Sequence, residues 1–395
     1  MRKRRRIAPL LAAALLLLTS GCAESKAPET VTSSAPAASD GTSAESGADI
    51  VGSMELQYAE QFSVDHRRDG CSIITIADER FLLVPEGTET PADCAGMTVI
   101  KQPVEEIYLA ASSAMDLFDG IGGLDRVTMT STEEKNWSLP NIAEAIHDGR
   151  ITYIGKYSAP DYEALTETGC GLAIESTMIY HSPETREKIE QLGIPVLVER
   201  SSYETHPLGR MEWLKLYGLL LGKSDEAERY FAEKTAAFDK IAESAGDNAE
   251  KKRLTAAFFY ISPNGYVNIR KPSDYVPKMM ELAGGEYIFK AADLNIDENA
   301  LSSMNIQTEK FYELARDADV LIYNSTIEGE VSSVAQLVDK CGILSDFKAV
   351  KEGNVWCTGQ NMFQQTTGAA DMIVDLNRIF TGSADNELTY LHRLE

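Results

Sequence analysis

Two consecutive helical segments, with no strand signal between them, occupy residues 205–246 of a chain that otherwise alternates strands and helices. Ser224 is placed to cap the second helix, and Gly246 stands just past its end. At 1.5 Å per residue this helix is roughly 33 Å long, about the width of a small domain. It could therefore join two lobes, although an ordinary surface helix of one domain is the alternative. Its apolar residues recur at three- and four-residue steps and form one stripe: Ala227, Tyr230, Phe231, Phe238, Ile241, Ala242 and Ala245.

The chain on either side of this segment has the pattern of an α/β fold. Strands are expected in the first half at 71–77, 80–85, 107–111, 151–154, 172–174 and 195–198, and in the second half at 254–261, 320–323 and 355–357. Helical patterns lie between most of them, which implies sheets covered by helices on both faces. Gly222 and Ser224 split the central segment, so 207–221 is expected to finish the first lobe. The sequence predicts two α/β lobes joined by a single long bridging α-helix.

Residues 1–22 have the features of an export leader, with a basic start followed by an apolar run too short to span a bilayer. The leader ends in Leu-Thr-Ser-Gly-Cys at Cys22 and resembles a bacterial lipoprotein signal, in which the cysteine receives diacylglycerol. A plain secretory leader with an incidental cysteine is the alternative. We therefore expect an extracytoplasmic protein, lipid-anchored to the outer face of the cell membrane. The predicted regions are 1–22 (leader), 23–50 (disordered tether without aromatic residues), 51–223 (first lobe), 224–246 (bridging helix) and 247–395 (second lobe).

The charge of the chain excludes some partners. The formal net charge is −24, and removal of the five basic residues in the leader makes it −29. Such a surface repels phosphate backbones and anionic lipids, so we expect no nucleic-acid partner and no electrostatic attachment to a membrane.

The sequence offers no recognisable catalytic or metal-binding motif. Five cysteines follow Cys22, none with CxxC spacing, and the five histidines are scattered. Cys71 and Cys94 flank the expected hairpin and could pair outside the cell, but their isolated placement favours buried free thiols. We expect no catalysis, no bound metal and no cofactor.

Aromatic and basic residues recur in the turns after the expected strands, where ligands bind in open α/β sheets. Tyrosine and tryptophan stack on flat ligands, and arginine pairs with anionic groups. The alternative for each aromatic residue alone is partial packing in the core. The candidate ligand-binding residues are Tyr108, Ser112, Ser113, Trp137, Tyr157, Met178, Tyr180, Arg200, Tyr203, Tyr260, Tyr266, Arg270 and Phe363.

Four stretches resemble signatures of one known family: 103–127, 151–174, 282–289 and 347–356. The family is that of the solute-binding lipoproteins of bacterial ABC importers for iron-siderophores, haem and cobalamin, the class III periplasmic-binding-protein type with one long bridging helix. The match runs from about residue 100 to 382, and residues 51–100 match less clearly. The resemblance implies a monomer that binds an iron chelate or corrinoid between its lobes and docks on an ABC permease dimer.

The family docks through one glutamate on each lobe, and the residues that match by position are Glu163 and Glu309. Glu167 and Glu313 lie four residues further on the same helix faces, so either pair could make the contact. Two other functions stay open. A secreted hydrolase would need His181 or His206 beside a Ser or Asp, and a metal-ion or haem receptor would need a cluster of ligating side chains or a tyrosine with one of these histidines.

Overall fold

The computed structural model describes residues 49–245, 252–298, 302–384 and 388–395, although not the side chains of 242–245, 360 and 361. The predicted leader with Cys22 and nearly all of the predicted tether lie outside the described residues. Among the helices described, none is both long and apolar enough to cross a membrane.

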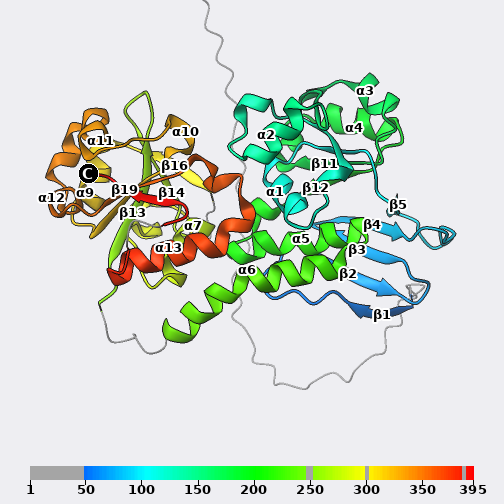
Figure 1. Ribbon diagram of the computed structural model, residues 1–395, viewed down its shortest axis with the longest axis horizontal. Coiled ribbons are helices and arrows are strands. Elements are labelled where there is room, and N and C mark those ends of the chain that lie inside the picture. The colour runs from blue at the N-terminus through cyan, green and yellow to red at the C-terminus, as the bar shows by residue number, and fades with distance from the viewer. Residues whose placement is uncertain (1–48, 246–251, 299–301, 385–387) are drawn as a thin grey trace, which may run out of the picture. The chain divides into compact units, whose positions relative to one another are not determined.

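The first lobe is built on a five-stranded parallel sheet of order β12-β11-β6-β7-β8 (Figure 1). Its strands are β6 Ile107–Leu109, β7 Val127–Thr130, β8 Thr152–Tyr153, β11 Leu172–Ser176 and β12 Val196–Glu199. The connecting helices are α1 Ser112–Gly120, α2 Pro140–His147, α3 Tyr162–Glu167 and α4 Pro183–Gln191, and β9 Gly155–Lys156 pairs with β10 Ala159–Pro160 in a small ribbon. Every residue of β6 and β12 is buried, as expected for parallel strands covered on both faces.

The second lobe has a seven-stranded mixed sheet of order β16-β14-β13-β17-β18-β19, with β15 also paired to β13. Its strands are β13 Thr255–Ile261, β14 Val267–Arg270, β15 Glu286–Tyr287, β16 Ser303–Ile306, β17 Val320–Tyr323, β18 Val355–Thr358 and β19 Leu391–Arg393. Its helices are α7 Tyr275–Leu282, α8 Ala291–Leu294, α9 Thr308–Ala315, α10 Ser325–Glu328, α11 Val334–Lys340, α12 Lys348–Glu352 and α13 Ala369–Thr381. Helix α11 begins after Ser333, whose side chain caps it by accepting from the Gln336 N–H.

The central segment forms the two predicted helices, α5 Pro207–Leu221 and α6 Ser224–Ala245. Gly222 ends α5 in the left-handed conformation, with a φ of 68°, which explains why the helix stops there. Figure 1 shows α6 running alongside both α5 and α13, and all three helices pack on one another. Of the expected stripe, Ala227, Phe231 and Phe238 are buried at 6% exposure or less, and Tyr230 and Ile241 are half-buried. The side chains of Ala242 and Ala245 lie outside the described residues. The bridging helix therefore packs against elements of both lobes.

Residues 50–101 form a second five-stranded sheet, hereafter the N-terminal sheet. Its strands are β1 Ile50–Ser53, β2 Phe62–Arg67, β3 Ser72–Ile76, β4 Glu79–Val84 and β5 Thr98–Lys101, paired in chain order. The expected hairpin is its β3–β4 unit, in which Ile74 lies opposite Phe81. One face packs into the main core, where the Phe62 ring lies 4.9 Å from the ring of Trp213 in α5.

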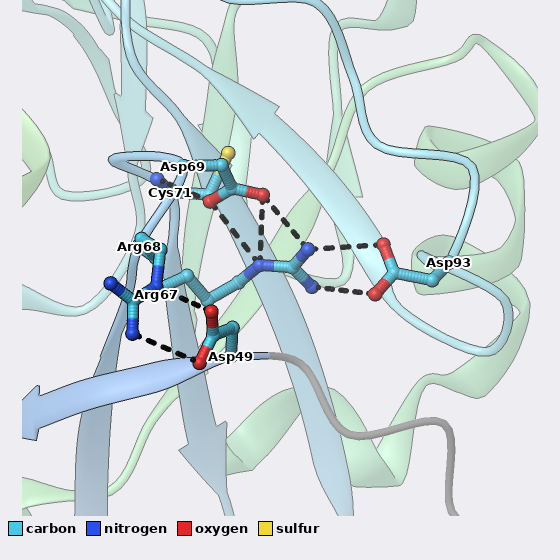
Figure 2. Close-up of polar contacts among 6 residues, drawn as sticks. All are labelled: Asp49, Arg67, Arg68, Asp69, Cys71 and Asp93. Atoms are coloured by element: carbon cyan, nitrogen blue, oxygen red, sulfur yellow. Dashed lines mark hydrogen bonds and ion pairs between the residues drawn. The ribbon is translucent and has the colours of Figure 1, made fainter.

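On the other side of the N-terminal sheet, Arg67 is the centre of a network of hydrogen bonds and ion pairs (Figure 2). The Arg67 guanidinium contacts Asp69 at 2.8 Å and Asp93 at 3.1 Å, so it joins the end of β2 to the loop before β5. Hydrogen bonds from the Arg67 guanidinium, aided by its charge, lower the pKa of both carboxyls. Cys71 and Cys94 contribute to one apolar cluster on this side, and both are free thiols, as are Cys170, Cys341 and Cys357.

Candidate functional site

The loops at the carboxyl ends of the parallel strands form the candidate site. In the first lobe these strand-end loops follow β6, β7, β11 and β12, and in the second lobe they follow β17 and β18 together with the β13–β14 turn. Parallel strands end at one edge of a sheet, so each lobe gathers its loops at one edge.

Each lobe places one arginine against an aromatic ring at this edge. The Arg200 guanidinium, after β12, lies 4.6 Å from the centre of the Tyr203 ring. The Arg270 guanidinium, at the end of β14, lies 4.7 Å from the centre of the Phe363 ring, which follows β18. Four of the candidate residues thus form two cation–π pairs, one in each lobe. A guanidinium held against a ring keeps hydrogen-bond donors free for an anionic partner.

Exposed apolar side chains also gather on these loops. Eight large hydrophobic side chains are exposed among the described residues, and five belong to strand-end loops: Met178, Tyr180, Tyr203, Tyr266 and Ile327. Four of the five were candidates from the sequence, whereas Ile327 was missed. Ile327 is the most exposed of the eight at 60%, and its isolated position between polar residues gave no periodic signal.

Two candidate residues lie in the core instead of facing solvent. Tyr108 is fully buried because it belongs to the central strand β6 and not to the turn after it. Trp137 is 8% exposed, and its indole N–H donates to the carbonyl of Thr132 at 3.3 Å. Neither ring is open to a ligand in this structure. The remaining candidates are half-buried: Ser112, Ser113, Tyr157, Arg200, Tyr260, Arg270 and Phe363.

The candidates Tyr260, Tyr266 and Arg270 belong to the β13–β14 hairpin and not to a turn alone. Tyr260 lies within β13, Tyr266 ends the turn, and Arg270 lies at the far end of the antiparallel strand β14. Arg270 reaches the site through its side chain, which ion-pairs with Asp274 at 3.6 Å as well as contacting Phe363.

Contacts at this edge join the two lobes. The Gln364 side chain accepts a hydrogen bond from the Ser138 N–H at 2.6 Å and donates one to the Asn136 carbonyl at 2.8 Å. The Thr366 hydroxyl donates to the Ser113 carbonyl, and the Thr367 N–H donates to the buried Asp116 carboxylate at 2.7 Å. Sequence reasoning gave no role to Gln364, because its partners lie more than two hundred residues away.

Two arginines, one from each lobe, lie near the ring of Tyr275. Arg210 of α5 lies 4.0 Å from the ring centre of Tyr275 in α7, and Arg270 lies 5.6 Å from the same ring. Burial raises the pKa of both Glu199 and Asp274, and the positive charge of Arg210 opposes each shift. The arginines therefore keep two buried carboxylates of different lobes closer to their ionised forms.

Glu175, in β11 beneath the loop of Met178 and Tyr180, is a buried carboxylate with no partner among the described residues. Its exposure is 0%, and neither carboxylate oxygen has a hydrogen bond. Burial raises its pKa to about 8. The buried hydroxyl of Tyr108 also lacks a partner, and burial, followed by the charge of Glu175, raises the pKa of that tyrosine.

The predicted docking glutamates occupy equivalent positions in the two lobes. Glu163 lies in the first turn of α3 and Glu309 in the first turn of α9, and both are exposed. Neither carboxylate has a partner among the described residues, while Glu313 is paired with Lys310 at 3.1 Å. In the second lobe this difference favours Glu309 over Glu313 as the unpaired carboxylate available for docking.

A cavity of about 710 Å³ lies elsewhere, between residues 57–60, the start of α5 and residues 272–290. It contains none of the candidate ligand residues. Two of its lysines are already paired with carboxylates of the same cavity, Lys278 with Glu281 and Lys290 with Glu286. We therefore place the candidate site at the strand-end loops and not in this cavity.

Two arrangements that the other functions would use are not seen in the described part of the chain. It contains no group of three or more His, Cys, Asp or Glu side chains that could hold a metal ion. Within the same ranges no hydrogen bond links His181 or His206 to a Ser or Asp side chain. His206 instead caps α5 by accepting from the Leu208 N–H at 3.2 Å, and burial lowers its pKa to about 4.

Two α/β lobes, a long helix packed on both, and paired arginine–aromatic contacts at the strand ends define a two-lobed solute-binding protein. The sequence model of the periplasmic binding protein family matches residues 107–362, and the chain belongs to this family. The family resemblance and the fold expected from the sequence are both confirmed.

An uncharacterized lipoprotein of Methanocaldococcus jannaschii is 29% identical over 71% of this chain, and the alignment spans 66% of that relative's own length. The solved structures of similar fold include the following two. A periplasmic haem-binding protein from Pseudomonas aeruginosa has a TM-score of 0.57 at 13% identity, covering 74% of this chain and 98% of its own. The catecholate-siderophore binding protein VctP from Vibrio cholerae has a TM-score of 0.55 at 12% identity, covering 70% and 94%.

Proposed function

We propose that this protein is the extracytoplasmic substrate-binding lipoprotein of an ABC importer. It captures a ferric siderophore or a similar iron-chelate or corrinoid ligand between its lobes and delivers it to the permease. Cys22 carries the lipid anchor in this proposal. The names of the haem- and siderophore-binding neighbours and of the lipoprotein relatives support it.

The observation that carries the proposal is the composition of the strand-end loops. They hold five of the eight exposed large apolar side chains of the described residues, Arg200 stacked on Tyr203, and the Phe363 ring that contacts Arg270 of β14. Exposed rings suit the flat or apolar faces of a large chelate, and guanidinium groups suit its carboxylates or catecholates.

Binding is tested by titrating the purified protein with ferric hydroxamates, ferric catecholates, haem and cobalamin while following tryptophan fluorescence. At least one should bind with micromolar or tighter affinity, and Tyr203→Ala should weaken that binding. Leu192→Ala is the matched control, because Leu192 has the same 42% exposure as Tyr203 but lies outside the strand-end loops. If no compound binds more tightly than millimolar, this ligand class is wrong.

Docking is tested by changing the two free glutamates together. Glu163→Ala with Glu309→Ala should abolish ligand uptake and leave ligand affinity unchanged, because both carboxylates are exposed and unpaired. Glu167→Ala with Glu313→Ala is the matched control on the same helices. Lost ligand affinity in the first double variant would place these residues in the binding site, and equal loss of uptake in both would remove the assignment.

A further inference from the structure

The N-terminal sheet lies before residue 107, where the match to the family begins. Its link between β1 and β2, residues 54–61, crosses α5 and the loop after β12. Two buried carboxylates hold this link. Glu212 accepts hydrogen bonds from the N–H groups of Gln57, Tyr58 and Ala59 at 2.8–3.1 Å.

Glu204, in the loop after β12, holds the end of the same link. Its carboxylate accepts from the Glu60 N–H at 2.8 Å, the Gln61 N–H at 3.0 Å and the Trp213 indole N–H at 2.9 Å. Glu204 is 2% exposed and Glu212 is fully buried, so these bonds are shielded from water. The backbone at residue 61 is thereby fixed against the loop that carries Arg200 and Tyr203.

The fixed backbone directs the Gln61 side chain to Arg200. Its carbonyl oxygen accepts from both Nε and Nη2 of Arg200 at 3.4 Å. The Arg200 guanidinium is also stacked on Tyr203, so it has an amide on its edge and a ring on its face. Three of its five N–H donors then remain for another acceptor.

We propose that the N-terminal sheet forms part of the ligand site, and that Gln61 is a positioning residue that orients Arg200 toward an anionic group of the ligand. The inference rests on the proposed function. An arginine already held in one orientation loses less side-chain entropy when it binds an anion, so the support of Gln61 raises affinity for anionic ligands.

The test compares Gln61→Met, which removes the acceptor, with Gln57→Met, an exposed position on the same link. The probes are the trianionic iron(III) tris-catecholate complex and an uncharged iron(III) trihydroxamate. Gln61→Met should weaken binding of the anionic complex about three- to tenfold, the value of one hydrogen bond. Binding of the uncharged complex and the melting temperature should not change, and Gln57→Met should have no effect.

Two further measurements separate the possible failures. In an Arg200→Ala background, Gln61→Met should have no additional effect on the anionic complex, because Gln61 acts through Arg200. The Nε–H proton of Arg200, followed by NMR without ligand, should exchange more slowly in the wild-type protein than in Gln61→Met.

If the wild-type protein binds neither complex and also binds neither haem nor cobalamin, the proposed ligand class fails, and the NMR comparison alone decides whether Gln61 orders Arg200. Equal weakening of both complexes, an equal effect of Gln57→Met, or unchanged exchange at Arg200 would overturn the positioning role.

Discussion

At the scale of single residues, the least compensated group in the described structure is Glu175. Its two carboxylate oxygens are buried without partners, so the protein favours the protonated form and its pKa rises to about 8. In the unfolded chain the same carboxyl should ionise near pH 4.5. Glu175 therefore leaves stability intact below about pH 4.5 and lowers it progressively as the pH rises toward 8.

Replacing this carboxyl by a neutral amide should remove that pH dependence. Glu175→Gln is expected to raise the free energy of unfolding at pH 8 by about 2–4 kcal/mol relative to the wild-type protein, and to leave it nearly unchanged at pH 4.5. Urea unfolding at the two pH values measures the difference. An equal effect at both would show that Glu175 ionises normally in the folded protein.

The sequence predicts residue types at the site better than it predicts the direction of each side chain. It placed Arg200 with Tyr203 because they lie in one loop, and the structure pairs them. It also proposed Tyr108, which is buried because it lies within β6, and Trp137, whose indole is buried and donates to the Thr132 carbonyl. Gln61 and Gln364 were missed since their contacts bridge long distances along the chain.

At the scale of elements, the junction of α5 and α6 depends on two glycines with different roles. Gly222 adopts a φ of 68°, and a Cβ there would meet no atom within 4 Å. Gly218 has ordinary helical geometry, but its Cβ would come within 2.6 Å of the Ala227 Cβ on α6. Gly222 is needed for the left-handed backbone conformation of the turn, and Gly218 allows α5 and α6 to approach closely.

Alanine substitutions should distinguish these roles. Gly222→Ala should cost about 1 kcal/mol of stability, from backbone strain alone. Gly218→Ala should cost about 1–3 kcal/mol, because the added methyl group forces α5 and α6 apart despite alanine's better helix propensity. Thermal unfolding of both variants measures which substitution lowers stability more. A smaller loss of stability for Gly218→Ala than for Gly222→Ala would show that the helices separate easily.

Element prediction succeeded where the signals were local. The ends of α5 agree with the prediction because proline opens the helix and glycine closes it. The N-terminal sheet was predicted only as a hairpin, since β1, β2 and β5 are short, partly polar strands. β2 packs against α5 through Phe62 and Trp213, a contact between distant segments that local patterns do not reveal.

At the scale of the whole molecule, α6 packs against α5 of the first lobe and α13 of the second, and Gln364 joins the lobes beside the candidate site. A helix that packs on both lobes resists large bending, so we expect closure of only a few degrees on ligand binding. The account requires one ligand to be held by both lobes, by Arg200 on one side and Arg270 on the other.

Isothermal titration calorimetry with the iron(III) tris-catecholate complex tests this requirement most directly. Arg316→Ala is the matched control, because Arg316 also lies over an aromatic ring, that of Tyr312 at 5.5 Å, but lies outside the strand-end loops. The account predicts one site per protein, with Arg200→Ala and Arg270→Ala each weakening binding about tenfold or more and Arg316→Ala leaving it unchanged. Loss of affinity in only one arginine variant, or in neither, would contradict capture between the two lobes.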